Sequence, residues 1–127
     1  MQENQLFEYA VIRLVPRVER EEFLNVGVIL FCAKIKFLKS VYQLNQHRIN
    51  IFCKELDVSA VEDHLKTIEL ICRGDKEGGP VAKLAMAERF RWLTATRSTV
   101  VQTSKVHPGF SINPQETLEK LFNQLVV

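Results

Sequence analysis

Residues 6–44 read LFEYAVIRLVPRVEREEFLNVGVILFCAKIKFLKSVYQL, and this stretch decides the fold. Its three runs rich in Val, Ile, Leu and Phe predict strands at Leu6–Val15, Phe23–Ala33 and Phe37–Leu44. Pro16 ends the first run, because a proline has no N–H to donate to a sheet ladder. The links between the runs are short, so we expect consecutive strands to pair as an antiparallel meander.

The first run carries apolar side chains on both faces of the expected strand. Phe7 and Tyr9 alternate with Ala10 and Ile12, a pattern typical of a central strand covered on both sides. In the second run, Gly27 interrupts a series of large aliphatic residues. A glycine in that position indicates a bulge or a close approach of another backbone.

Beyond residue 44 the periodicity changes from that of strands to that of helices. We expect a short helix at Asn45–Lys54, and then a longer one that Ser59 begins through a Ser-x-x-Glu capping box. Gly74–Pro80 reads as a mobile linker. Pro80 can occupy the first position of a further helix that extends to about Trp92.

The C-terminal part alternates strand and helix signals. Ser98–Lys105 predicts a fourth strand, and His107–Gly109 predicts a turn because it contains a proline followed by a glycine. Asn113 and Pro114 have the residue types preferred at the N-cap and first position of a helix. The whole chain, residues 1–127, is therefore expected to be a single α+β domain: an antiparallel sheet of about four strands with helices packed on it.

The composition is that of an ordinary globular domain, with 46% hydrophobic and 25% charged residues. A net charge of +2 is smaller than the Lys and Arg excess expected of a duplex-DNA-binding protein. The sequence shows neither a secretion signal nor an apolar run long enough to span a bilayer, so we expect a cytoplasmic protein without membrane association. The three cysteines lack metal-ligand spacing and read as reduced core residues: Cys32, Cys53 and Cys72.

The segment between Glu88 and Glu116 contains no acidic residue, although it contains several basic and hydroxyl side chains. Guanidinium groups beside hydroxyls can bind a phosphate or a carboxylate. A histidine in such a set can also move a proton near neutral pH. A solvated strand and loop surface is the alternative interpretation. The predicted anion-binding set is Arg91, Arg97, Ser98, Thr99, Gln102, Ser104 and His107.

A second polar set lies around the first two strands and consists of Arg13, Arg20, Glu22 and Asn25. Asn25 stands in an otherwise apolar run, where an unpaired buried amide costs about 1–3 kcal/mol. In a meander, Arg13 is expected to neighbour Glu22 or Asn25 across the ladder. The set is either an ion pair that fixes the strand register or a polar site that joins the anion-binding set in one pocket.

Motifs of common catalytic families are missing from the chain. The sequence contains no G-x-S-x-G, no H-E-x-x-H and no kinase signature. No pair of acids accompanies the basic segment, so we expect neither a metal nor another cofactor. The sequence assigns no catalytic residue.

Two stretches carry a family resemblance. Tyr9–Phe31 contains YAVIRLVP and REEFLNVGVILF, and Phe90–Gly109 reads FRWLTATRSTVVQTSKVHPG. They resemble the bacterial family catalogued as domain of unknown function 3037. Both polar sets, apart from Arg91, match the family's polar pattern. The chain departs from that pattern at Glu21, where a glycine is usual.

The resemblance implies no established activity. It implies genes encoded beside those of HipA-like protein kinases, which suggests a kinase-like or toxin–antitoxin protein partner. The sequence does not indicate an oligomeric state.

Three functions stay open. The first is a non-enzymatic accessory or interaction module with an anion-accepting pocket. The second is a small metal-independent enzyme acting on phosphate esters or nucleic acid, with His107 as acid and base and Arg97 as the oxyanion clamp. The third, not favoured, is nucleic-acid binding with Trp92 as a stacking platform, since Trp92 is expected in the core.

Overall fold

The computed structural model describes residues 3–127 and contains the meander that the sequence predicts. β1 (Gln5–Leu14), β2 (Leu24–Cys32) and β3 (Phe37–Tyr42) pair antiparallel in the order β3-β2-β1. Each strand begins and ends within two residues of its predicted limits. The predicted α+β fold with an antiparallel sheet is therefore confirmed.

Two short strands continue the sheet on the other side of β1. β4 (Val101–Thr103) pairs with the end of β1, and β5 (His107–Ser111) pairs with its beginning. Together they resemble one edge strand that is interrupted at residues 104–106. The strand predicted at Ser98–Lys105 is thus present but shorter.

The predicted turn at His107–Gly109 is wrong, because these residues belong to β5. Pro108 lies opposite Glu8 in a strand at the edge of the sheet, where no further strand needs its missing N–H. Gly109 is required for space: a Cβ atom there would lie 2.5 Å from Cζ of Phe7. Pro108 and Gly109 are therefore explained by an edge strand that packs against the ring of Phe7.

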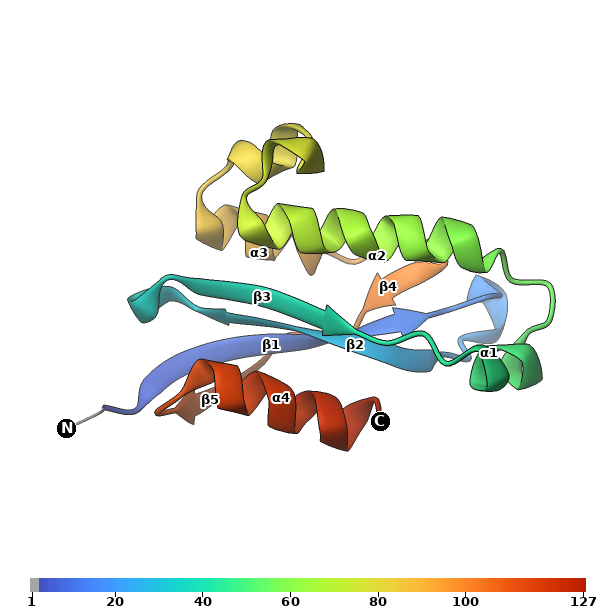
Figure 1. The fold of residues 1–127 in the computed structure, drawn as a ribbon, viewed down its shortest axis with the longest axis horizontal. Helices are drawn as coiled ribbons and strands as arrows, with labels where there is room; N and C mark the ends of the chain where they lie inside the picture. Colours follow the sequence, from blue (N-terminus) through green and yellow to red (C-terminus); the bar gives the residue numbers. More distant parts are fainter. Residues whose placement is uncertain (1–2) are drawn as a thin grey trace.

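Helices cover both faces of the sheet (Figure 1). α2 (Val58–Arg73) and α3 (Met86–Leu93) lie on one face, and α4 (Pro114–Leu125) lies on the other. α1 (Gln46–Phe52) sits at one end, beyond β3. No helix within residues 3–127 has the length and apolar character needed to cross a membrane.

Side chains on the two faces of β1 belong to two separate apolar clusters. Ile12 and Leu14 pack with α2 and α3, whereas Phe7 packs with Leu118 of α4. Ala10, Ile12 and Leu14 are fully buried. The prediction of a central strand covered on both sides is therefore confirmed.

Three helical details differ from the sequence prediction. Asp57, and not Ser59, is the N-cap of α2, because its carboxylate accepts a hydrogen bond from the first turn. The segment after Gly79 is a 3₁₀ turn (Pro80–Lys83), and α3 begins only at Met86 after an extended residue. The segment predicted as an open linker contains a further 3₁₀ turn, Lys76–Gly78.

Two positions in the β1–β2 hairpin show why glycine is favoured there. A Cβ atom on Gly27 would lie 2.6 Å from the carbonyl oxygen of Val41, and the β1–β2 register shifts between Ile12 and Arg13. The predicted close approach and bulge are thus both confirmed. Glu21 adopts a φ of 56°, a left-handed conformation that glycine adopts without steric penalty. A glycine at position 21, which the family resemblance implies, would adopt this conformation freely.

The two candidate caps of α2 can be separated by substitution. Asp57→Ala is expected to lower the free energy of unfolding by about 1 kcal/mol, because a backbone N–H of the first turn loses its acceptor. Ser59→Ala is expected to leave it nearly unchanged. Urea denaturation followed by circular dichroism measures both variants, and a larger loss in Ser59→Ala would contradict the observed cap.

Candidate functional site

The arginines of the segment between Glu88 and Glu116 form hydrogen bonds within the protein. Arg89 is buried and its Nη1 donates to the carbonyl oxygens of Ile71 and Cys72, at 2.8 and 3.0 Å. Arg91 forms a two-pronged ion pair with Glu8, both contacts at 2.9 Å. The hydrogen bond that Arg91 donates to the Glu8 carboxylate raises the pKa of Arg91. Arg89 is thus enclosed by the fold, and both terminal nitrogens of the exposed Arg91 are bonded to Glu8.

Arg97 closes the C-terminal end of α3. Its guanidinium donates to the carbonyl oxygens of Trp92, Leu93 and Ala95. It also lies over the Trp92 ring, 4.3 Å from the ring centroid. Trp92 itself is 43% exposed, so its expected place in the core is wrong.

The structure does not gather the predicted anion-binding set into one receptor. His107 packs against Tyr9 with the two rings tilted by 35° and their centroids 5.3 Å apart, on the face of the sheet covered by α4. Arg97 is attached to α3 on the opposite face. A shared pocket for Arg97 and His107, which the sequence analysis envisaged, is therefore absent from residues 3–127.

The remaining members of that set make local contacts. The Ser104 hydroxyl accepts from the Val11 amide at 2.8 Å and helps to join β4 to β1. Thr99 donates to the Val101 carbonyl, and Gln102 donates to the Thr99 carbonyl. Ser98 is exposed in the loop before β4.

Two members of the second polar set, Arg13 and Asn25, lie in one row with Gln102 of the anion-binding set. The other two members lie apart from this row. Arg13 lies opposite Asn25 on β2 and opposite Gln102 on β4, so the expected Arg13–Asn25 neighbourhood is confirmed. These three side chains form a polar row across three strands. Arg13 lies over the Phe23 ring at 3.9 Å from its centroid, and Arg13 Nε has no hydrogen-bond partner in the described part of the chain.

Arg20 and Glu22 pair with each other at 2.5 Å at the exposed tip of the β1–β2 hairpin. The hydrogen bond and charge of Arg20 lower the pKa of Glu22. Neither Arg20 nor Glu22 belongs to β1 or β2, so this ion pair does not fix the register between the two strands.

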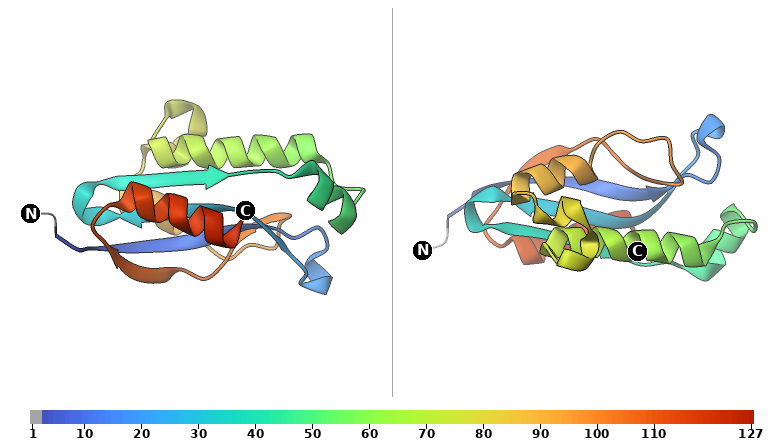
Figure 2. Two further views of the ribbon diagram at one scale, coloured as in Figure 1. Left: turned by 60° about the horizontal axis from the view of Figure 1, so that its bottom comes forward. Right: turned by 90° about the horizontal axis from the view of Figure 1, so that it is seen from above.

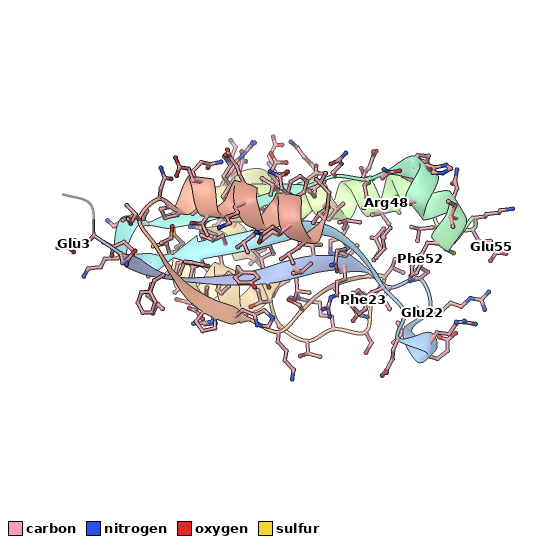
Figure 3. The ribbon with its side chains drawn as sticks, turned by 90° about the horizontal axis from the view of Figure 1, so that it is seen from below. Glu3, Glu22, Phe23, Arg48, Phe52 and Glu55 are labelled. Atoms are coloured by element: carbon pink, nitrogen blue, oxygen red, sulfur yellow. The ribbon has the colours of Figure 1, made fainter. Side chains whose placement is uncertain are left out.

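The largest recess described lies between this hairpin and α1, and we call it the hairpin groove. Its volume is about 670 Å³, and Figure 3 shows Glu22 and the α1 side chains Arg48 and Phe52 around this end of the molecule. Its lining residues come from 16–24 and 48–55, two segments that are distant in sequence. They are Pro16, Arg17, Arg20, Glu22, Leu24, Arg48, Ile51, Phe52, Cys53, Lys54 and Glu55.

Basic side chains outnumber acidic ones in the groove, four to two. Arg20 is paired with Glu22, and Arg48 donates to the Val126 carbonyl at 2.7 Å. Arg17 and Lys54 take part in none of the ion pairs found within residues 3–127. Glu55 is likewise absent from these ion pairs, so the four basic and two acidic lining residues give the groove a net charge of +2.

The groove also has an apolar rim. Ile51 is 75% exposed and Phe52 is 36% exposed. Only Ile49 of α1 is buried. The Ile51 and Phe52 side chains form an exposed apolar rim in the same groove as Arg17 and Lys54. No local pattern in the sequence indicates this groove, because only tertiary packing brings 16–24 against 48–55.

A second recess of about 380 Å³ continues the groove toward α2 and shares Pro16, Arg17, Cys53 and Glu55 with it. His64 lines this recess. Burial, and secondarily the charge of Arg97, lower the pKa of His64 below its usual 6.5. Within residues 3–127 no cluster of three or more His, Cys, Asp or Glu residues is placed to hold a metal ion.

Comparison with protein families identifies the chain. The model of the family described as "Protein of unknown function (DUF3037)" matches residues 9–126, which include all five strands except the start of β1. The chain belongs to this family. The DUF3037 match confirms the resemblance seen in the two sequence stretches. Searches of curated proteins and of solved structures found no match.

The His64 environment gives a pH-dependent prediction. Because the folded-state pKa lies below 6.5, the unfolded state binds more protons between those two values. The contribution of His64 to stability is therefore present above pH 6.5 and is lost as the pH falls through the folded pKa. NMR titration of His64 should show this lowered pKa, and Arg97→Ala should raise it.

Two variants control this measurement. Arg97→Lys retains the charge and should keep the pKa of His64 closer to its native value than Arg97→Ala does. Arg73→Ala removes an exposed arginine paired with Glu69 and should not affect His64. A His64 pKa that is identical in Arg97→Ala and the native protein contradicts the described placement of Arg97.

Proposed function

We propose that this protein is a non-enzymatic interaction module that receives an acidic segment of a protein partner in the hairpin groove. The observation that carries the proposal is an open groove with two unpaired cations, Arg17 and Lys54, beside an exposed apolar rim. Acidic side chains of the partner would meet these cations, and an apolar side chain would cover Ile51. The volume of the groove falls within the range typical of ligand-binding clefts.

The mixed charge of the groove supports a protein ligand over a nucleic acid. Glu22 and Glu55 line it together with the basic residues. A peptide can place its acidic side chains on Arg17 and Lys54 and neutral ones beside the two glutamates, whereas a phosphate backbone carries a negative charge at every nucleotide. The exposed Trp92 favours nucleic-acid stacking, but its neighbour Arg97 is bonded to backbone carbonyls and Arg91 is paired with Glu8. A stacking platform without free cations nearby lacks the electrostatic part of such binding.

An enzyme built on Arg97 and His107 is not supported by the geometry. General acid–base catalysis needs both groups within reach of one substrate atom, and the two residues lie on opposite faces of the sheet. A HipA-like kinase, the partner suggested by the family resemblance, is the first candidate for the interaction.

Photo-crosslinking in the native cell tests the proposal. A photoreactive amino acid in place of Ile51 is expected to capture one discrete partner protein. The double substitution Arg17→Glu and Lys54→Glu is expected to weaken the interaction with that purified partner about 10-fold, because two attractive charges become repulsive. The affinity of the native protein should also fall with added salt.

A matched charge reversal controls for net charge. Lys34 and Lys36 lie in the β2–β3 turn at the other end of the sheet, so their substitution by Glu should leave the affinity unchanged (Figure 1). The proposal fails if both double variants weaken the interaction equally, or if the crosslinked species is a nucleic acid.

A further inference from the structure

The outer edge of β5 is an unpaired strand edge bordered by exposed apolar side chains. Figure 2 shows β5 at the rim of the sheet, with no element beyond it. Leu6 and Phe110 lie opposite each other on β1 and β5 and are 55% and 71% exposed. Ile112, directly after β5, is 53% exposed. Large exposed apolar residues on a sheet edge are a surface that native proteins normally cover.

The backbone groups that point outward can be assigned from the pairing. Pro108 has no N–H, so it occupies a position of β5 that is not hydrogen-bonded to Glu8. Phe110 lies two residues further along β5, and since hydrogen-bonded and non-hydrogen-bonded positions alternate, it too is not hydrogen-bonded to β1. Its N–H and C=O therefore point away from β1. The Leu6 carbonyl agrees with this assignment, because it points toward β2 and accepts from Cys32 Sγ at 3.4 Å.

We infer that this edge pairs with β5 of a second copy of the chain, antiparallel and with a two-fold axis at Phe110. In that register the two Phe110 residues exchange both backbone hydrogen bonds. Ile112, in the bend directly after β5, then lies next to the carbonyl of the partner copy's Pro108, and the two bonds between the Phe110 residues are those that β5 itself supplies.

The missing N–H of Pro108 is what favours a second copy as the occupant. Because Pro108 has no N–H, Phe110 provides the one N–H of β5 that points away from β1. A strand that paired with the whole edge would therefore lack a hydrogen-bond donor opposite Pro108. The two-fold register centres on the one residue with both groups outward. It uses Pro108 only as an acceptor.

The same register also covers the apolar side chains. A two-fold axis perpendicular to the sheet keeps the α3-side face of both copies on one side. Leu6 and Phe110 of the two copies would then form one continuous apolar strip across the junction. The interface is smaller than that of a typical permanent dimer, so we expect dissociation constants of roughly 1–100 μM.

Sedimentation over a range of protein concentrations tests the inference. The native chain should shift from monomer to dimer across this range. Phe110→Pro should remain monomeric, because it removes the central N–H of the junction. The substitution takes away no hydrogen bond to β1, so circular dichroism should show a retained fold.

A second variant keeps the inference testable if Phe110→Pro does not fold. In a Cys53→Ser background, Phe110→Cys should form a disulfide-linked dimer on mild oxidation, because the two-fold register places the two residues directly opposite each other. Ile51→Cys, an equally exposed position at the other end, should crosslink far less. A native chain that stays monomeric at about 100 μM, or equal crosslinking of both cysteines, overturns the inference.

Discussion

Burial of β1 on both faces is the constraint on which the rest of the structure depends. Its even-numbered residues from Ala10 to Leu14 are sealed beneath α2 and α3, and Phe7 is sealed beneath α4. A polar side chain in this strand can be accommodated only where the cover ends. Arg13 occupies such a place, in the same row as Asn25, whose amide donates to the Leu125 carbonyl at the end of α4. The candidate polar residues therefore gather where the helical layers end.

Three arginines of this protein bind carbonyl groups at the C-terminal ends of helices. Arg89 donates to the last turn of α2, Arg97 to the last turn of α3, and Arg48 to the residue after α4. Unpaired carbonyls at a helix C-terminus carry partial negative charge, so a cation there needs no carboxylate partner. This capping role accounts for Arg89 and Arg97 in the basic segment that resembled an anion receptor in the sequence, whereas Arg91 pairs with the distant Glu8.

The meander could be predicted from the sequence, whereas the hairpin groove could not, and particular residues show the reason. Alternating apolar positions and short links specify β1–β3 locally, and Asn113 caps α4 as its residue type predicts, accepting from the Glu116 amide. Gly109, in contrast, is needed because Phe7, about a hundred residues earlier, lies against it. Likewise, the hairpin groove exists only because 16–24 and 48–55 pack at the same end of the sheet. Contacts of this kind leave no local pattern that composition or periodicity could reveal.

The two proposed surfaces lie at opposite ends of β1, and this separation has a consequence for binding. The hairpin groove lies beyond Leu14, whereas Phe110 pairs near the start of the strand. Ten residues of strand span about 33 Å, so pairing through β5 leaves each groove open. A dimer of this kind would present two grooves in a fixed relative geometry. A partner carrying two acidic segments, or itself a dimer, would then bind with an effective concentration that a single weak groove could not provide.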